Sequence, residues 1–526
     1  MKYFSTVAMI ALLAGSVSPV WAQDRGGILN FARYDGSKLI DPIYADRNPD
    51  IWMVLNLYDT LLTMKDGAAV DNLTQSHEVS ADGLTLTLTL RDDIKFSDGS
   101  PMTGADVVFS LDRARNRDLT SWADLIASID KVSADGNVVT VALKHPDPAI
   151  LSMLSTFSTA IVSKAVFDAA PGANDQEKAA AIFASGKPGV GSGPFYLSGF
   201  SQGATMDFTA NPNYWREGAD GKPLPYLEGV HFEIIPDDAT RVLKLQSGEV
   251  DVAELIPFSR VAELKADPNL KMELFPSTRI IYAPINTRET RADGSANPLN
   301  NVKLRQALNY ATDKDALVGL VLQGAGAPMS SPLMSAQTPM AADMSPLYGY
   351  DIEKAKTLIE EAGIQPGTPL TFTTLAGSAD DATVFAALQQ MWAPLGINLT
   401  VEQVDSATRG AKNKSGEFDI HTYGWSDDVA DPAQVVGWLG YNPTANAVGT
   451  AWDDATFNGL YETANAEMDP AKRTDDYKQM QEIYAEAAPL LWLYQTPYAV
   501  ATSTGVEGYV QLPLGVNKFD EATVKH

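Results

Sequence analysis

Side chains that could carry out chemistry are few and scattered along this chain of 526 residues. It has five histidines, no two of them three or four positions apart: His77, His145, His231, His421 and His526. Zinc sites and catalytic triads need such side chains in clusters, so the sequence gives these chemistries little support. Cysteine is absent, which excludes disulfides, thiolate metal sites and thiol nucleophiles together.

Glycine-rich and acid-rich segments do not match a cofactor motif either. Gly191-Ser192-Gly193 is followed by Pro194 and not by the helix start that a phosphate-binding loop requires. Asp427, Asp428 and Asp431 form a carboxylate cluster that could bind calcium, but it lacks the alternation and the closing Glu of a calcium-binding hand. We therefore expect no catalytic residue, no bound metal and no cofactor.

The first 22 residues predict export. Lys2, an apolar stretch over 7–14 and the small-residue exit Val20-Trp21-Ala22 are typical of a signal peptide cleaved near Ala22. The alternative, a membrane anchor, is disfavoured because Gly15, Ser16 and Pro19 interrupt the apolar run. No cysteine is present to carry a lipid, so untethered export indicates a Gram-negative periplasm. No later segment approaches the roughly 20 apolar residues of a membrane span, and we expect no direct membrane insertion.

Charge and length narrow the class further. The formal net charge of −27 becomes −28 without the predicted signal peptide, because Lys2 is its only charged residue. A field of that sign repels phosphate backbones, so we expect no nucleic-acid partner. A mature chain of about 500 residues is long enough for two or three packed units rather than one core.

The helices and strands that would position a binding site are mixed along the chain, and this pattern predicts an α/β protein. Two Asp-Gly turns, at 82–83 and 135–136, each precede an alternating strand, which predicts the same hairpin chemistry used twice. Further strands are expected at 27–32, 230–235 and 397–404, and amphipathic helices at 51–62, 103–117, 239–246, 302–311, 352–361, 382–392 and 471–486. No run of Pro, Ser or charge marks a flexible linker, so the units should be closely joined.

An ordered series of segments carries a family resemblance. The most specific stretch runs from Leu90 to Arg113 and contains Phe96-Ser97-Asp98-Gly99 and Thr103-Gly104-Ala105-Asp106. It resembles the signature segment of family 5 of the extracellular solute-binding proteins of ATP-binding cassette importers, the peptide/opine/nickel class; Gly104 stands where Ala is more usual. Shorter matches follow in the family's order at 56–61, 191–195, 211–215, 245–251, 304–308, 355–363, 424–428 and 488–490.

The resemblance implies a two-lobed periplasmic binding protein fold, type II, cluster C, with an extra domain inserted in the first lobe. By similarity, lobe I takes residues 23–55, 190–276 and 495–526, the extra domain 56–189, and lobe II 277–494. The implied function is that of a monomeric, non-enzymatic receptor. It would capture a small polar solute, an oligopeptide or a peptide-like conjugate such as an opine, between closing lobes and deliver it to an inner-membrane permease complex.

Four ligand-binding residues are expected on this basis. In peptide-binding relatives, the acid at the place of Asp428 pairs with the ligand's ammonium, and Trp425 three residues earlier could lie over the ligand. Tyr34, after the first strand, and Trp122, in the extra domain, are chosen by position and ring chemistry. Dipeptide-binding relatives also offer an Arg to the peptide carboxylate in the helix that begins near Asp381, where this chain has none.

The sequence leaves several alternatives open. The ligand could be a longer peptide, an opine, a sugar conjugate or a metal chelate, because the family signature does not fix the side chains of the cleft. A periplasmic hydrolase of peptides or conjugates is a second reading, and a chemotaxis receptor or peptide chaperone with the same fold is a third.

Overall fold

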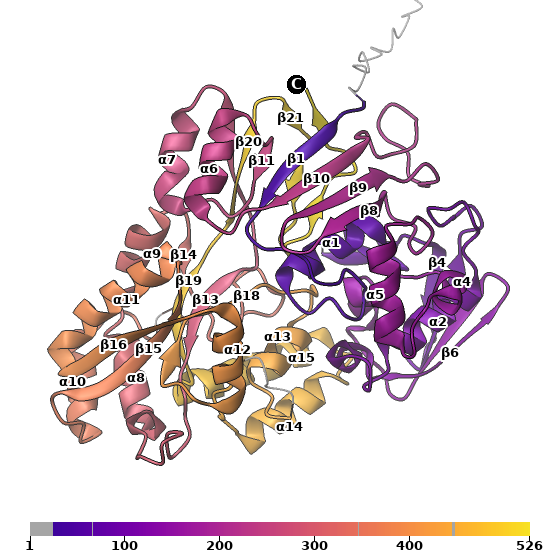
Figure 1. Ribbon diagram of the computed structural model, residues 1–526. Coiled ribbons are helices and arrows are strands. Elements are labelled where there is room, and N and C mark those ends of the chain that lie inside the picture. Colours follow the sequence, from indigo (N-terminus) through magenta and orange to yellow (C-terminus); the bar gives the residue numbers. More distant parts are fainter. Residues whose placement is uncertain (1–24, 66, 346, 444–447, 526) are drawn as a thin grey trace, which may run out of the picture.

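Three groups of strands, each accompanied by helices, make up the protein (Figure 1). The computed structural model describes residues 25–65, 67–345, 347–443 and 448–525. The predicted signal peptide, residues 1–22, lies outside the described residues. Helices and strands mix along the whole described chain, so the predicted α/β class is confirmed.

The first group is a seven-stranded sheet that collects strands from distant parts of the chain. β1 runs parallel to β10 and β11, and the remaining strands join antiparallel. The spatial order is β12 (Leu270–Phe275), β20 (Tyr498–Ser503), β11 (Val252–Ala253), β1 (Ile28–Arg33), β10 (Gly229–Ile234), β9 (Thr205–Ala210) and β8 (Phe195–Ser201). Because side chains alternate across a strand, Phe31 and Ala32 join separate hydrophobic cores on the two faces.

Helices cover both faces of this sheet. α6 (Asp238–Ser247) and α7 (Phe258–Ala266) pack against β11, β12 and β20. α1 (Asn48–Leu57) packs against β8 and belongs to the other core. Short C-terminal strands complete this part of the chain: β21 (Val506–Glu507) pairs with β24 (Thr523–Val524), and β22 (Val510–Gln511) with β23 (Asn517–Lys518).

The second group holds two sheets. One has the order β14 (Ala327–Pro328), β19 (Leu490–Gln495), β13 (Ile280–Pro284) and β18 (Tyr423–Trp425); the other has β16 (Ile397–Val404), β15 (Thr368–Leu375) and β17 (Ile420–His421). Its helices are α8 (Val302–Tyr310), α9 (Lys314–Leu322), α10 (Ile352–Glu361), α11 (Ala379–Trp392), α12 (Ser406–Ser415), α13 (Pro432–Leu439), α14 (Ala455–Ala464) and α15 (Pro470–Ala487).

The third group is built from residues between β1 and β8. Its antiparallel sheet has the order β4 (Thr74–Val79), β5 (Thr85–Leu90), β7 (Val138–Leu143) and β6 (Ile129–Asp135), so the two predicted hairpins are confirmed and lie side by side. Gly83 and Gly136 turn the hairpins with φ of 71° and 57°, values that favour glycine. The other elements are β2 (Leu62–Lys65), β3 (Ala68–Asp71), α2 (Gly104–Ala114), α3 (Ile150–Met153), α4 (Lys164–Ala169) and α5 (Asp175–Ser185).

Most predicted elements form with small shifts at their ends. The strand at 397–404 and the helix at 352–361 have the predicted bounds, and Thr103 caps α2 as expected, sharing a capping box with Asp106. The helix predicted at 51–62 instead runs from Asn48 to Leu57. Pro49 favours the earlier start, and the chain turns extended at Tyr58 to lead into β2.

The chain passes between the first and second groups at two places. It leaves the seven-stranded sheet after Phe275 and enters β13 at Ile280, and it returns between Gln495 and Tyr498. The two crossing segments are joined, because the Ser277 hydroxyl donates to the Thr496 carbonyl at 2.5 Å. The residue bounds given above for the lobes and the extra domain stay a prediction.

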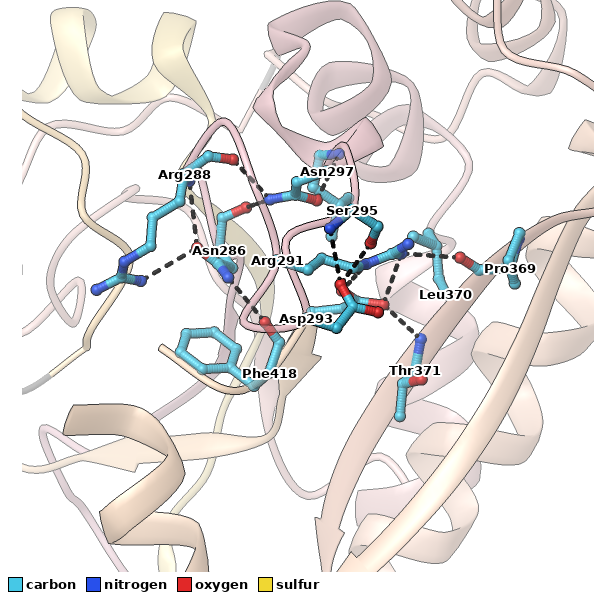
Figure 2. Close-up of polar contacts among 12 residues, drawn as sticks. Asn286, Arg288, Arg291, Asp293, Ser295, Asn297, Pro369, Leu370, Thr371 and Phe418 are labelled. Atoms are coloured by element: carbon cyan, nitrogen blue, oxygen red, sulfur yellow. Dashed lines mark hydrogen bonds and ion pairs between the residues drawn. The ribbon is translucent and has the colours of Figure 1, made fainter. Parts of the chain in front are cut away.

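The loop after β13 contacts the residues just before β17 through several side chains (Figure 2). The Asn286 side-chain amide donates to the Phe418 carbonyl at 2.9 Å, and the Asn297 amide donates to the Asn286 carbonyl at 2.8 Å. Arg291 makes a bidentate ion pair with Asp419 at 2.7 and 2.9 Å. These contacts hold the start of β17, and with it the chain that continues into β18, against β13.

Gly104, where the family more usually has Ala, begins α2 against the β6–β7 hairpin. A Cβ atom built at Gly104 would lie 2.6 Å from the Ala134 Cβ and 2.8 Å from the Gly136 carbonyl oxygen. The backbone of the helix and the backbone of the hairpin therefore approach too closely for a side chain. The departure from the family pattern is explained by this contact.

Gly104→Ala should destabilise the protein by about 1–3 kcal/mol, because the added methyl group must push the hairpin away. The matched control is Gly319→Ala within α9, where a Cβ meets nothing within 4 Å; it should stabilise by about 1 kcal/mol through helix propensity. Urea unfolding of both variants measures the two changes. Equal effects from both substitutions would contradict the close approach at Gly104.

Candidate ligand-binding site

Two neighbouring acids after β18 have different surroundings. Asp427 is 2% exposed, and both its carboxylate oxygens accept hydrogen bonds, from the Trp425 indole N–H at 3.0 Å and from the Thr338 hydroxyl at 2.6 Å. Its backbone N–H donates to the Thr278 hydroxyl at 3.0 Å. Asp427 therefore ties the loop to the first crossing segment, and its hydrogen-bonding capacity is taken up inside the protein.

Asp428 is half-buried, and only one of its two carboxylate oxygens accepts a hydrogen bond. Its Oδ2 accepts from the Gln434 side-chain amide at 2.7 Å, and its backbone N–H donates to the Gln434 Oε1 at 3.0 Å. Among the described residues, no donor lies within hydrogen-bonding distance of Asp428 Oδ1. Gln434, on α13, is 1% exposed, so it holds the carboxylate in one orientation.

Burial raises the pKa values of both acids, Asp427 and Asp428. Loss of hydration raises the pKa of Asp427 and that of Asp428 to about 7, and the neighbouring Asp427 carboxylate adds to the shift at Asp428. The carboxyl of Asp428 is thus partly protonated near neutral pH in the ligand-free protein. A nearby cation would favour its ionised form.

Three tryptophans from two of the strand groups meet beside these acids. Trp122, in the short 3-10 helix Ser121–Ile126, stacks on Trp438 of α13 with ring centroids 4.9 Å apart and planes at 23°. Trp425 meets the same ring edge-on at 5.8 Å. Trp438 packs against both large hydrophobic cores, so it bridges the second group of strands and the part of the chain between β1 and β8.

Tyr34 is linked to this region through a second chain of contacts. Its ring lies 6.2 Å from that of Trp52, which lies 5.3 Å from that of Tyr498. The Tyr498 hydroxyl donates to the Ser426 hydroxyl at 3.0 Å, two residues before Asp428. Burial raises the pKa of Tyr34, so its phenol stays protonated at neutral pH.

The structure therefore brings the four expected residues into one region of the molecule. Trp425 and Trp122 have their indole N–H groups occupied, by Asp427 and by the Ala45 carbonyl, so they offer mainly ring surface. Their role in binding, and that of Tyr34 and Asp428, stays a prediction. Sequence reasoning missed Trp438 and Tyr498, because only the folded chain brings them beside Asp428.

The third acid of the sequence cluster serves the scaffold. Asp431 caps α13 and makes a buried bidentate ion pair with Arg473 at 2.7 and 2.8 Å. The three acids consequently do not converge on one point. Within the described ranges, no group of three or more His, Cys, Asp or Glu side chains is arranged to hold a metal ion. The arrangement offers a carboxylate and aromatic rings, which suits the binding of a cationic group.

No helix in the described part of the chain is both long and apolar enough to cross a membrane.

Two bodies of strands and helices joined by a pair of crossings form the two-lobed fold that is typical of periplasmic binding proteins. A solved structure with this fold is the ABC transporter-associated periplasmic binding protein DppA from Helicobacter pylori in complex with the peptide STSA. It superposes with a TM-score of 0.82 at 24% sequence identity, covering 96% of this chain and 99% of that one. The predicted two-lobed fold is confirmed by this likeness.

The chain belongs to the bacterial extracellular solute-binding proteins, family 5, since the model of the family's middle region matches residues 68–447. It is 28% identical over 499 residues to the dipeptide-binding protein of Escherichia coli strain K12, covering 89% of each chain. It is 29% identical over 543 residues to the glutathione-binding protein GsiB of Pectobacterium atrosepticum, covering 98% of this chain and 96% of the relative. The resemblance stated from the sequence is confirmed.

The raised pKa of Asp428 predicts how stability changes with pH. The folded protein binds this proton more tightly than the unfolded chain, whose Asp has a pKa near 3.8, so the contribution favours folding at low pH and is lost as pH rises toward 7. Asn does not ionise, so the Asp428→Asn variant does not lose folding stability in this way as the pH rises. The variant should therefore gain about 1–2 kcal/mol over wild type between pH 4.5 and 8, a figure reduced because the side chain is half-buried.

Guanidinium unfolding at intervals of one pH unit measures this difference. Asp118→Asn, which changes the same charge at an exposed position, is the control and should show a constant offset. A constant offset for Asp428→Asn as well would contradict the raised pKa.

Proposed function

We propose that this protein is the receptor of an ATP-binding cassette importer, working in the periplasm as a monomer. It captures a small peptide-like solute between its two lobes and delivers it to a membrane permease complex. The single observation that carries the proposal is the half-buried Asp428 carboxylate, oriented by Gln434 and left with one oxygen free beside aromatic rings from two parts of the fold. A ligand ammonium there would make a charge-assisted hydrogen bond.

The names of similar proteins support a peptide-like ligand. They are a dipeptide-binding protein, a glutathione-binding protein and a receptor solved with the peptide STSA. Peptides carry an amino group that suits Asp428. An opine or another conjugate with an amino group remains within the proposed class.

Closure of the lobes is the proposed signal for import. A ligand can shift the protein toward its closed form only by binding that form more tightly. The Trp122–Trp438 stack and the Tyr498–Ser426 hydrogen bond join parts that would separate on opening. We propose the lobe bounds given above, residues 23–55, 190–276 and 495–526 for lobe I, 56–189 for the extra domain and 277–494 for lobe II, with the hinge at the two crossings.

Native mass spectrometry of the purified protein should detect a small molecule bound one to one. A pool of di- to tetrapeptides should raise the stability of the protein by mass action, about 2.7 kcal/mol at one hundred times the dissociation constant.

Asp428→Asn should weaken peptide binding by about 2 kcal/mol or more, because the ligand's ammonium loses its buried partner. Calorimetric titration of both proteins measures this loss.

Asp118→Asn is the control for the change in net charge and should bind as wild type does. Unchanged affinity in Asp428→Asn would refute the ammonium site, and turnover of any peptide in the pool would refute the binding-protein class.

Peptide affinity should also depend on pH. Because the pKa of Asp428 is about 7 in the ligand-free protein and a bound ammonium favours the ionised carboxylate, affinity should rise roughly tenfold from pH 5.5 to pH 7. The Asn variant should show a flat profile over this range. Equal profiles for the two proteins would mean that Asp428 does not bind the cation.

A further inference from the structure

One arginine in the first crossing segment has no hydrogen-bonded or ion-paired partner for its side chain within the described part of the chain. Among the arginines that the structure describes, only Arg279 makes neither a side-chain hydrogen bond nor an ion pair. The chain carries 66 acids against 39 basic residues, so an unpaired guanidinium is not explained by a shortage of carboxylates. Arg279 is half-buried, and burying a charge without a partner is costly.

The backbone of Arg279 is held firmly although its side chain is not. Its N–H donates to the Ser277 hydroxyl at 3.0 Å, and its carbonyl accepts from the Thr496 N–H at 3.1 Å, in the returning segment. The register of β13 and β18, with Ile280 opposite Trp425, places Arg279 next to Ser426. The backbone of Arg279 is thus positioned by both crossings and lies next to the loop that carries Asp428.

A glycine and an acid lie near the guanidinium. A Cβ atom built at Gly424 would be 3.9 Å from the Arg279 Nη2. The carboxyl of Asp380, in the first turn of α11, is near enough for Arg279 to oppose the burial that raises its pKa to about 6, yet the two form no ion pair within 4.0 Å. Asp381 accepts from the Leu375 N–H and from the Thr422 hydroxyl, both at its Oδ2, and it forms no ion pair with Arg279 within 4.0 Å.

Opposite charges act on one tyrosine in this region. Burial is the main cause of the raised pKa of Tyr498, and Arg279 acts on that hydroxyl with the opposite sign to Asp428 and Asp427. The Tyr498 hydroxyl donates a hydrogen bond to Ser426, two residues before Asp428. The charges of Arg279 and Asp428 are thus both near enough to influence this tyrosine.

We propose that Arg279 is a binding site for an anionic group of the ligand, in particular a peptide carboxylate, and that with Asp428 it selects zwitterions. This rests on the receptor function proposed above and adds the anionic half of the recognition. A guanidinium binds a carboxylate through two parallel hydrogen bonds, and Arg279 has all its donors available for them. The helix α11 has no arginine at the place where dipeptide-binding relatives offer one to the peptide carboxylate. Arg279, in the first crossing segment, would supply that positive charge from a different element.

The spacing favours short peptides. Asp428 lies two residues beyond the position that Arg279 faces, a path of about 7 Å along an extended chain. The ends of a peptide are separated by at most about 3.3–3.6 Å per residue, so a di- to tetrapeptide matches this scale once the reach of the two side chains is included.

The test uses the pool of di- to tetrapeptides prepared twice, with free C-terminal carboxylates and as C-terminal amides. Wild type should bind the free acids at least about 30-fold more tightly than the amides, because only the acids pair with Arg279. Arg279→Gln should lose this preference and Arg279→Lys should retain part of it. Competition native mass spectrometry on the full chain, followed by calorimetry on the members retained, measures the ratios.

Two controls keep the result specific. Arg115→Gln removes the same charge at an exposed position and should leave the preference unchanged. Arg279→Gln should unfold in urea close to the wild-type midpoint, since the arginine side chain makes no hydrogen bond or ion pair within the described residues, and its affinity for the amides should be unaltered.

Three results would overturn the site in distinguishable ways. If wild type binds acids and amides alike, or if Arg279→Gln binds the free acids as wild type does, the carboxylate site is wrong while the receptor function stands. If wild type binds neither pool at millimolar concentration, the peptide-receptor function fails, and the assignment of Arg279 to a peptide carboxylate fails with it.

Discussion

Pairing between the two crossing segments is the constraint on which the candidate site depends. The same two stretches of chain pair as β12 and β20 in the seven-stranded sheet and as β13 and β19 in the second group, with the Ser277–Thr496 hydrogen bond between. Residues in such a ribbon cannot slide past each other without breaking both ladders. Arg279 and Tyr498, which lie at the ends of these segments, therefore keep their positions along the two crossings.

The acid-rich loop illustrates how structure separates scaffold from site. Asp427 and Asp431 lie within four residues of Asp428, and each has its oxygens engaged, by Trp425 and Thr338 or by Arg473. Buried polar groups are normally satisfied, so groups that are not deserve a functional explanation. The free oxygen of Asp428 and the unpaired guanidinium of Arg279 share this property and lie in the same region.

Aromatic rings account for the way in which the bodies meet. Trp438 contacts Trp122 and Trp425, and it packs against both large cores, so the interface is apolar beside the charged groups. A poorly hydrated surrounding strengthens charge-assisted bonds and raises the pKa of the acids, as it does for Asp428. The same rings thus shape the contact between the bodies and tune the carboxylate.

Local patterns allowed much of the fold to be predicted. Alternation gave the bounds of β16, helical periodicity those of α10, and Asp-Gly turns gave the two hairpins, because each depends on neighbours within a few residues. The family was also recognisable, because the resemblance includes the continuous stretch from Leu90 to Arg113, which lies within the residues that the family model matches. The helix predicted at 51–62 begins earlier, at Asn48, because proline is favoured in the first turn of a helix and Pro49 occupies that turn.

By itself, the sequence determined the class of protein, since the family resemblance rests on contiguous motifs, and it proposed Asp428 as the acid for a ligand. Only the tertiary structure decided which of the neighbouring acids has a free oxygen, that Trp438 bridges two cores, and that Arg279 lacks a partner. These properties depend on residues such as Thr338, Gln434 and Thr496, separated along the chain and joined by packing and strand register. Local residue preferences do not predict such contacts, because the contact energies arise only when distant parts of the chain meet in the folded protein.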